Sequence, residues 1–361
     1  MTDPAPQLSW GLCISTYNRL DVLADCIACA LDQTRPAVEI VVVDASDDWV
    51  AGRERIAGMI AAAGRDIPLR YVPAQKKSLP AQRNQGVAQA SADILFLIDD
   101  DSFMHPGCAA EIMAIYEADS EGVLVSIAAT KSDLDPRAAL AGGPAAAHEM
   151  RKEQQRAVAG SRLKRFVWRE ILMQSVAANF VDFDLPDRRF AGEIPAALSD
   201  RVRPAPYIPG CQMTARREML LEEPFEGALL SYAAVEDRDA SYRFGRHGLI
   251  VQALAAPLHH SEVQMSRLKR RQVTAMHLLN VAFITRKNTR APLSHLGAVW
   301  IMTLRRLLAE FLKDAATKRW DFPQLQGVLI AMRHLPDLCR RKEPQLSAWY
   351  EGLQREILAK S

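Results

Sequence analysis

Short apolar runs alternate with helical patterns along the first 130 residues of the chain. The runs have the composition of buried strands and cover residues 10–16, 39–46, 69–74, 93–102 and 122–130. The segments between them have the mixed apolar and polar spacing of helices and cover residues 19–33, 52–64, 81–91 and 106–119. Apolar strands that alternate with helices are typical of a parallel sheet covered on both faces. The pattern therefore predicts an α/β fold.

The rest of the chain is less regular until it becomes helical. Residues 131–200 predict a loop interrupted by glycine and proline, followed by a helix, and the segment PAPYIPGCQMTARRE predicts a loop that leads into a strand or a helix. From residue 262 onward the pattern is helical. Proline lacks the amide N–H that a helix interior needs, so helix breaks are expected at Pro292, Pro323, Pro336 and Pro344. We therefore expect two regions, residues 1–261 and residues 262–361.

Polar side chains follow the predicted strands at the points where these strands end. They are Thr16, Asn18, Asp44, Asp99 and Asp101. The carboxyl ends of parallel strands meet along one edge of a sheet, and ligands of such sheets bind beyond that edge. We therefore expect these five side chains to converge on one ligand site.

The stretch ILFLIDDDSF, residues 94–103, ends a buried strand in three adjacent aspartates, Asp99, Asp100 and Asp101. Adjacent carboxylates repel one another and are costly to desolvate. A divalent cation such as Mg²⁺ or Mn²⁺ would remove the repulsion, because it takes oxygen ligands and is the largest charge in its surroundings. A solvated loop or a helix N-cap is the alternative interpretation, and the triplet alone does not decide between them.

Charge is distributed unevenly along the 361 residues. Residues 262–361 hold 18 Lys or Arg against 8 Asp or Glu, a net charge of +10, which leaves −8 for residues 1–261. A basic region on an acidic body suggests an anionic partner for that region. The six cysteines are scattered, the N-terminus lacks the features of a signal peptide, and no long uninterrupted apolar run occurs. These features predict a cytoplasmic protein without a membrane-spanning helix.

Five segments resemble, in order and spacing, the motifs of the family 2 glycosyltransferases. They are CISTYNR, IVVVDASDD, KKSLPAQRNQGVAQASADILFLIDDDS, EEPFEGALLSYAAVEDRDASYRFGRHG and APLHHSEVQMSR. The resemblance covers roughly residues 8–270 and implies a GT-A fold, which is Rossmann-like with a mostly parallel central sheet flanked by helices. Residues 1–261 would then be the catalytic domain, with a nucleotide-sugar half up to about residue 130 and an acceptor half from about residue 131. Residues 262–361 would be a C-terminal helical extension.

The resemblance also implies a donor and a cofactor. The donor would be a nucleoside-diphosphate sugar of the UDP or dTDP type, and the cofactor would be Mg²⁺ or Mn²⁺. Asp44 would read the base, Asp99 would hold the ribose, and Asp101 would bind the metal ion. His259 or His260 would contact the metal as well, with His259 preferred. The other nucleotide contacts implied by the motifs are Thr16, Asn18, Arg83, Asp100 and Arg267.

Two acidic residues in AVEDRD are implied to act on the acceptor. Asp237 would be the catalytic base, because sugar transfer with inversion needs a carboxylate near the acceptor hydroxyl. Glu236 would contact the acceptor or anchor its loop. The alternative for this pair is a helix start, where acidic residues interact favourably with the helix dipole. The two interpretations are compatible, because a helix N-terminus can also present a base.

Three functions remain open on the sequence. The first is a metal-dependent inverting glycosyltransferase that acts on a glycan or a lipid-linked acceptor in cell-surface polysaccharide or glycolipid assembly. The second is a nucleotidyltransferase, although STYNRLD lacks the glycines of a phosphate-binding loop. The third is a non-catalytic scaffold of the same fold that binds sugar or lipid. A nucleic-acid partner is not expected.

The C-terminal region has two interpretations of its own. The segment LSHLGAVWIMTLRRLLAEFLKDAATKRW places a dense apolar stretch against several arginines and lysines. Such a basic amphipathic helix packs on its own protein or on a second subunit, or it lies in the interface of an anionic membrane. The second use would place the protein on the inner face of the cell membrane as a peripheral protein.

Overall fold

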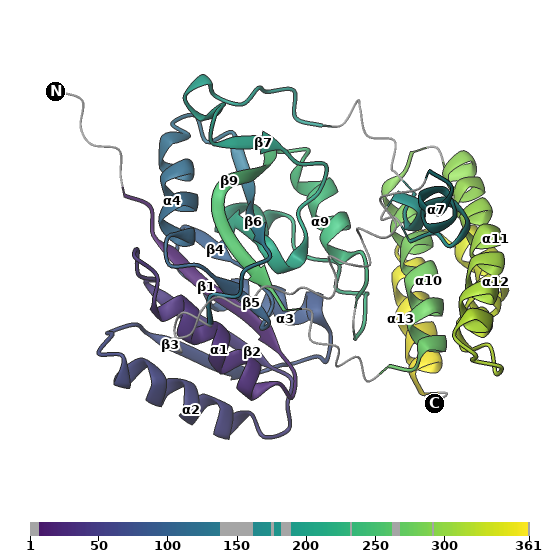
Figure 1. The fold of residues 1–361 in the computed structure, drawn as a ribbon, viewed down its shortest axis with the longest axis horizontal. Coiled ribbons are helices and arrows are strands. Elements are labelled where there is room, and N and C mark those ends of the chain that lie inside the picture. Colours follow the sequence, from purple (N-terminus) through teal and green to yellow (C-terminus); the bar gives the residue numbers. More distant parts are fainter. Residues whose placement is uncertain are drawn as a thin grey trace. The chain divides into compact units, whose positions relative to one another are not determined.

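The computed structural model describes residues 7–137, 162–174, 177–181, 189–231, 233–261, 268–290 and 292–359. The chain divides into two compact units (Figure 1). Unit 1 comprises Met1–Ala147, Arg189–Gly227 and Glu236–Val263, and unit 2 comprises His148–Arg188, Ala228–Val235 and Gln264–Ser361. The second unit therefore includes two segments that precede the C-terminal region in the sequence.

Unit 1 contains one nine-stranded mixed sheet, with strands in the order β3-β2-β1-β4-β8-β6-β9-β5 and with β7 paired to β9. The bounds are β1 Trp10–Thr16, β2 Glu39–Asp44, β3 Leu69–Pro73, β4 Ile94–Phe96, β5 Ser102–Met104, β6 Leu124–Ser132, β7 Val202–Pro204, β8 Met213–Arg216 and β9 Leu249–His260. Neighbours from β3 to β4 are parallel, β8 is antiparallel to both β4 and β6, and β6 is parallel to β9. Most described strands therefore run in one direction, and β5, β7 and β8 run in the opposite direction.

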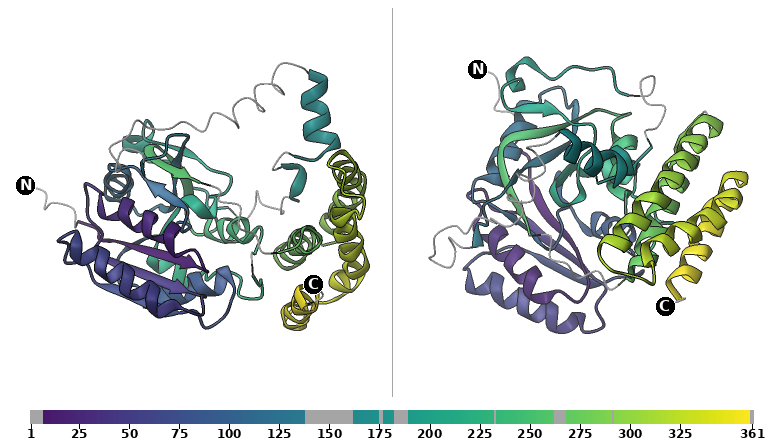
Figure 2. Two further views of the ribbon diagram at one scale, coloured as in Figure 1. Left: turned by 60° about the horizontal axis from the view of Figure 1, so that its bottom comes forward. Right: turned by 45° about the vertical axis from the view of Figure 1, so that its right-hand side comes forward.

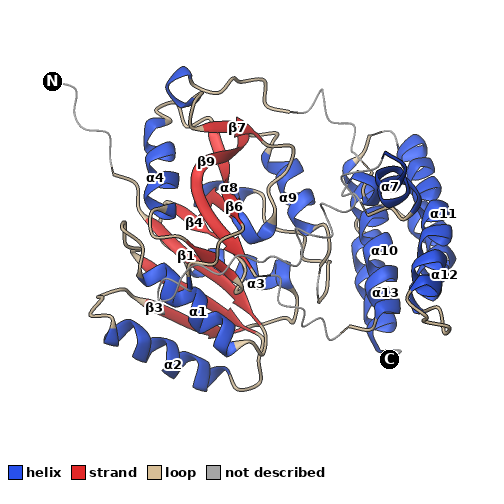
Figure 3. Cartoon of the chain, viewed as in Figure 1, coloured by secondary structure: helices blue, strands red, loops and turns tan. Residues whose placement is uncertain are grey.

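Helices cover both faces of this sheet, as Figure 3 shows. They are α1 Leu20–Leu31, α2 Trp49–Ala62, α3 Leu79–Gln89, α4 Cys108–Ala118, α8 Arg217–Glu222 and α9 Glu236–Phe244. Successive residues of a strand point to opposite faces, so Leu12 and Ile14 pack in one core with α1, α2 and α4. Cys13, between them, packs in a second core with α3, α8 and α9. The predicted α/β fold class, with its mostly parallel sheet and C-terminal helical region, is confirmed.

The predicted strand over residues 93–102 is shorter in the structure and is followed by a second one. β4 ends at Phe96, Asp100 and Asp101 lie in a turn, and β5 then pairs antiparallel with the end of β9. The register of this pair places Ser102 opposite His260 and Phe103 opposite His259. The aspartates are therefore held between two strand pairings.

Unit 2 is helical and includes four helices that run alongside one another (Figures 1 and 2). Its helices are α7 Arg162–Phe166, α10 Arg270–Asn288, α11 Pro292–Ala316, α12 Pro323–Arg340 and α13 Gln345–Ala359. Prolines begin α11 and α12 and precede α13, but the break expected at Pro336 is wrong, because this residue lies inside α12. Over the described residues, no helix is long and apolar enough to cross a membrane.

Candidate functional site

Three parallel strands of unit 1 end beside one another and carry the predicted polar residues. Thr16 and Asp44 are register partners at the last positions of β1 and β2, and the three aspartates follow β4. Parallel strands that share an edge bring their carboxyl ends together. The convergence expected from the sequence is therefore present for these residues.

Arg19, just before α1, offsets part of the negative charge of the aspartate triplet. Its Nη1 donates to Asp100 Oδ1 and its Nη2 to Asp101 Oδ2, both at 2.7 Å, and Thr16 Oγ1 donates to Asp100 Oδ2 at 2.7 Å. Burial nevertheless raises the pKa of Asp100 to about 7. Burial also acts to raise the pKa of Asp101, but hydrogen bonds from His260 and Arg19 lower it to about 2. Arg19 is part of the quoted motif CISTYNR, yet sequence reasoning gave it no role.

The two adjacent histidines at the end of β9 face different groups, because neighbouring strand residues point to opposite sides. His260 Nε2 lies 3.1 Å from Asp101 Oδ1. His259 instead stacks on Phe103 and has its Nδ1 3.1 Å from the carbonyl oxygen of Ser132. The structure therefore places His260, and not the preferred His259, beside the aspartates.

Ligand atoms of Asp99, Cys211 and His260 all lie within 4.8 Å of one another, and each of the three residues is partly exposed. Carboxylate, thiolate and imidazole are all common metal ligands. This group and the neighbouring Asp101 carboxylate fit a divalent cation. Sequence reasoning did not include Cys211 as a metal ligand. The only signal was its position after PAPYIPG, where the family motif approaches the acceptor.

The buried side chain of Arg83, on α3, joins the aspartate triplet to α9. Its Nη1 donates to Glu236 Oε1 at 2.6 Å, and its Nη2 donates to Asp99 Oδ1 at 2.9 Å and to the Gly210 carbonyl at 3.2 Å. A Cβ atom on Gly210 would lie 2.8 Å from Nη2, so the backbone approaches this closely only because residue 210 is glycine. Arg83 also lies 5.3 Å over the ring of Phe225.

Asp237 follows Glu236 in the first turn of α9. Its Oδ2 accepts from the Gly210 N–H at 3.2 Å and its Oδ1 accepts from the Arg238 N–H at 2.8 Å. Burial raises the pKa of Asp237 above its ordinary value, and these two hydrogen bonds act in the opposite direction. Burial also raises the pKa of Glu236, to about 8, although Arg83 opposes that shift. The helix start expected as one interpretation of this pair is present, and the role of Asp237 as a catalytic base stays a prediction.

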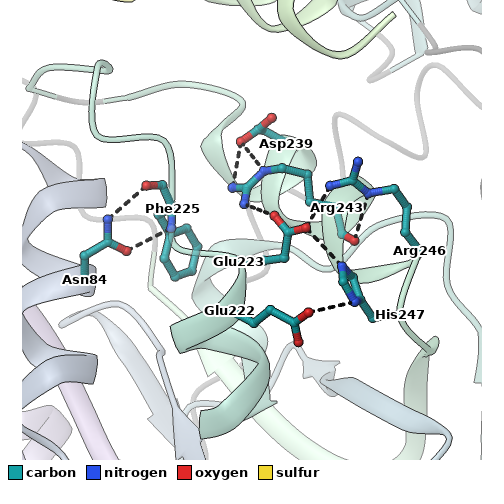
Figure 4. Close-up of polar contacts among 8 residues, drawn as sticks. All are labelled: Asn84, Glu222, Glu223, Phe225, Asp239, Arg243, Arg246 and His247. Atoms are coloured by element: carbon teal, nitrogen blue, oxygen red, sulfur yellow. Dashed lines mark hydrogen bonds and ion pairs between the residues drawn. The ribbon is translucent and has the colours of Figure 1, made fainter.

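A cluster of ion pairs holds α9 in place (Figure 4). Glu223, which follows α8, accepts from Arg243 at 3.0 Å, from Arg246 at 2.8 Å and from His247 at 3.0 Å. Arg243 also donates to Asp239 at 2.9 Å. Although burial acts to raise the pKa of Glu223, the hydrogen bonds from His247 and Arg243 lower it. These contacts anchor the helix whose first turn presents Glu236 and Asp237.

Asp44 has partners on both carboxylate oxygens. Its Oδ1 accepts from the Ser46 N–H at 2.8 Å, and its Oδ2 accepts from the Tyr71 hydroxyl at 2.6 Å. Asn18 lies in the left-handed region, with φ of 53°, and its backbone N–H donates to Ser46 Oγ at 2.6 Å. The predicted contact Arg267 lies outside the described residues.

Comparison with known proteins gives one family. The family model described as glycosyl transferase family 2 matches residues 12–172. The uncharacterized glycosyltransferase YwdF of Bacillus subtilis (strain 168) is 32% identical over 98 residues, which are 27% of this chain and 34% of that protein. The chain therefore matches about a third of the length of this curated relative.

Two solved structures are similar at low sequence identity. The mannosyltransferase PcManGT from Pyrobaculum calidifontis, in complex with GDP-Man and Mn²⁺, is 13% identical with a TM-score of 0.49, over 92% of this chain and 88% of that chain. GalNAc-T7 with UDP, GalNAc and Mn²⁺ is 12% identical with a TM-score of 0.46, over 77% of this chain and 47% of that chain. Residues 12–172 of this chain therefore match the model of glycosyl transferase family 2.

Proposed function

We propose that the chain transfers a sugar, with inversion, from a nucleoside-diphosphate sugar of the UDP or dTDP type to an acceptor hydroxyl. The observation that carries this proposal is the bridge made by Arg83, which bonds Asp99 at the strand edge and Glu236 at the start of α9. The bridge joins the residues proposed to hold the donor to those proposed to act on the acceptor. Transfer with inversion needs the residues that hold the donor and the residue that activates the acceptor hydroxyl to lie close enough for both substrates to bind side by side.

Asp237 is the proposed base that removes the proton from the acceptor hydroxyl. A base works best when its pKa lies near the working pH, and burial shifts the pKa of Asp237 in that direction. The Gly210 and Arg238 N–H groups fix its two oxygens. Glu236 is directed at Arg83 and is proposed to position α9 rather than to take a proton from the acceptor.

Asp99 and His260, with Asp101 beside them, are proposed to hold a Mg²⁺ or Mn²⁺ ion. Such an ion neutralises negative charge on the leaving diphosphate. Arg19 and Arg83, which bond Asp100 and Asp99, are proposed to stabilise negative charge on the diphosphate as well, and Thr16 donates a hydrogen bond to Asp100. Asp44 is proposed to accept a hydrogen bond from the imide N–H of uracil or thymine, in addition to the bonds from Ser46 and Tyr71.

Unit 2 is proposed to bring the enzyme to a lipid-linked acceptor in polysaccharide or glycolipid assembly. Helix α11 exposes Ile301, Leu304, Leu308 and Phe311 by 62, 52, 55 and 44%. Their spacing of three or four residues places them on one helix face. The nearby α7 and η1 (Val167–Ile171) expose Lys164, Arg165 and Arg169. An apolar face with exposed cations nearby fits the interface of an anionic membrane.

The test is release of nucleoside diphosphate from a panel of nucleotide sugars, with and without Mn²⁺. We expect Asp101→Ala to lose metal-dependent donor binding, whereas Asp237→Asn keeps donor binding and loses transfer by about 10²–10⁴-fold. Pyrophosphate release would indicate a nucleotidyltransferase, and donor binding without turnover would indicate a scaffold. Equal loss of donor affinity in the two variants would contradict the assignment of roles.

A further inference from the structure

We propose that Cys211 is a ligand of the metal ion, together with Asp99 and His260. This inference rests on the proposed metal dependence and names a side chain that the motifs do not assign to it. The site would then combine a carboxylate, a thiolate and an imidazole, and it would prefer softer metal ions than a site made of carboxylates and an imidazole.

The geometry requires only a small contraction. One ligand atom from each of the three residues lies within 4.8 Å of the others. Around a tetrahedral ion with metal–ligand distances of about 2.0–2.3 Å, the ligand atoms lie roughly 3.3–3.8 Å apart. Closing this difference takes movements of about 1 Å, which side-chain rotation supplies. Because all three residues are partly exposed, an ion from solvent can reach them.

The three side chains are held by different parts of the fold. Cys211 lies in the short 3₁₀ helix η4, Gly210–Gln212, which the Gly210 N–H ties to Asp237. His260 ends β9, and Asp99 is bonded to Arg83. Ligands that arrive from separate, anchored segments form a site with little loss of conformational freedom on binding.

Asp101 has a defined place in this arrangement. Its Oδ1 lies 3.1 Å from Nε2 of His260, and the same imidazole ring is hydrogen-bonded to the side chain of Cys211. A carboxylate on one ring nitrogen commonly orients a metal-bound histidine through the other. Asp101 is therefore either a direct ligand, as the motif implies, or the residue that orients His260. In both cases Cys211 completes the group.

The other cysteines lack such surroundings. Cys13, Cys26, Cys29 and Cys108 are buried, and Cys339 is the second partly exposed thiol. In the part of the chain that the structure describes, the group containing Cys211 is the one set of three potential ligands that lie close together. Cys339→Ser is therefore a matched control for Cys211→Ser.

The experiment is a titration of the full chain with Co²⁺, followed by its near-ultraviolet absorption. A thiolate ligand gives a sulfur-to-metal charge-transfer band. We expect this band in the wild type and in Cys339→Ser, and its loss in Cys211→Ser. In parallel calorimetric titrations, Cys211→Ser should weaken Cd²⁺ binding by about tenfold or more and Mn²⁺ binding far less, because the thiolate favours the softer ion.

The outcomes separate this inference from the proposed function. Bound Co²⁺ without the band, or a band that persists in Cys211→Ser, overturns the thiolate ligand, even if Mn²⁺ still supports release of nucleoside diphosphate. A Cys211-dependent band without any turnover of nucleotide sugars supports the ligand and contradicts the glycosyltransferase proposal. Near-ultraviolet circular dichroism checks that each variant is folded, and Asp99→Asn, which should weaken both metals, tests the site if Cys211→Ser unfolds.

Discussion

Glu236 is expected to make the stability of unit 1 depend on pH, and Glu236→Gln should remove that dependence. The side chain is buried, Arg83 donates to its Oε1, and no described donor reaches its Oε2. One guanidinium faces the carboxyl groups of Glu236, Asp99 and Asp237. The cluster therefore has more acidic groups than a single cation can neutralise, which favours a neutral Glu236.

The magnitude follows from the difference in pKa between the two states. Burial raises the pKa of Glu236 from its ordinary 4.5 to about 8 in the folded protein. Between these values the folded state holds a proton that the unfolded state has lost, so the free energy of unfolding falls as pH rises. A group that titrates only in the unfolded state changes the free energy of unfolding by 2.303RT per pH unit, which amounts to roughly 3 kcal/mol between pH 5.5 and pH 7.5.

The assay is urea unfolding of the wild type and of Glu236→Gln at these two pH values. Glutamine stays neutral at both, so the variant should lose less stability than the wild type, by about 2–3 kcal/mol. Glu117→Gln is the control. Hydrogen bonds from Arg35 lower the pKa of Glu117, so its contribution is complete above pH 4.5 and should not change between pH 5.5 and pH 7.5.

Equal pH dependence of the wild type and of Glu236→Gln would refute this reasoning. It would mean that Glu236 is ionised throughout and forms a full ion pair with Arg83. In that case, removing the carboxylate would leave a buried guanidinium with one partner fewer. Glu236→Gln would then be destabilised by a similar amount at both pH values, by about 3–5 kcal/mol.

Two further perturbations test other parts of the molecule. Asp44→Ala should weaken nucleoside-diphosphate binding without metal by roughly 1.5–3 kcal/mol, as measured by calorimetry. The control Tyr71→Phe keeps the Asp44 carboxylate and should bind the nucleoside diphosphate normally. An unchanged dissociation constant in Asp44→Ala would mean that Asp44 makes only its contacts within the protein. Leu308→Glu should reduce sedimentation with anionic liposomes at low salt, while Leu221→Glu, an exposed leucine of unit 1, should not. If the wild-type protein stays in the supernatant at low salt, the membrane proposal is contradicted, and the exposed face of α11 is better explained as a protein interface.

The sequence alone predicted the order of strands and helices up to about residue 130, because buried parallel strands are apolar along their length and helices are not. It also predicted that Thr16 and Asp44 lie together, since parallel strands end along one edge. The proline positions predicted the start of α11 and α12. They were misleading at Pro336, because a proline inside a helix can be tolerated when neighbouring contacts hold the helix.

Only the tertiary structure decided which side chains meet. The choice between His259 and His260 depends on the register of β9 against β5. A shift of one residue in that register would turn every side chain of the strand to the opposite face of the sheet. Charged partners at the site come from distant parts of the chain: Arg19 and Asp100 are separated by 81 residues, and Arg83 and Glu236 by 153 residues. The secondary-structure propensity of a short segment carries no information about contacts between segments that lie far apart in the sequence. Cys211 joins Asp99 and His260 for the same reason: three distant segments converge only when the sheet has formed.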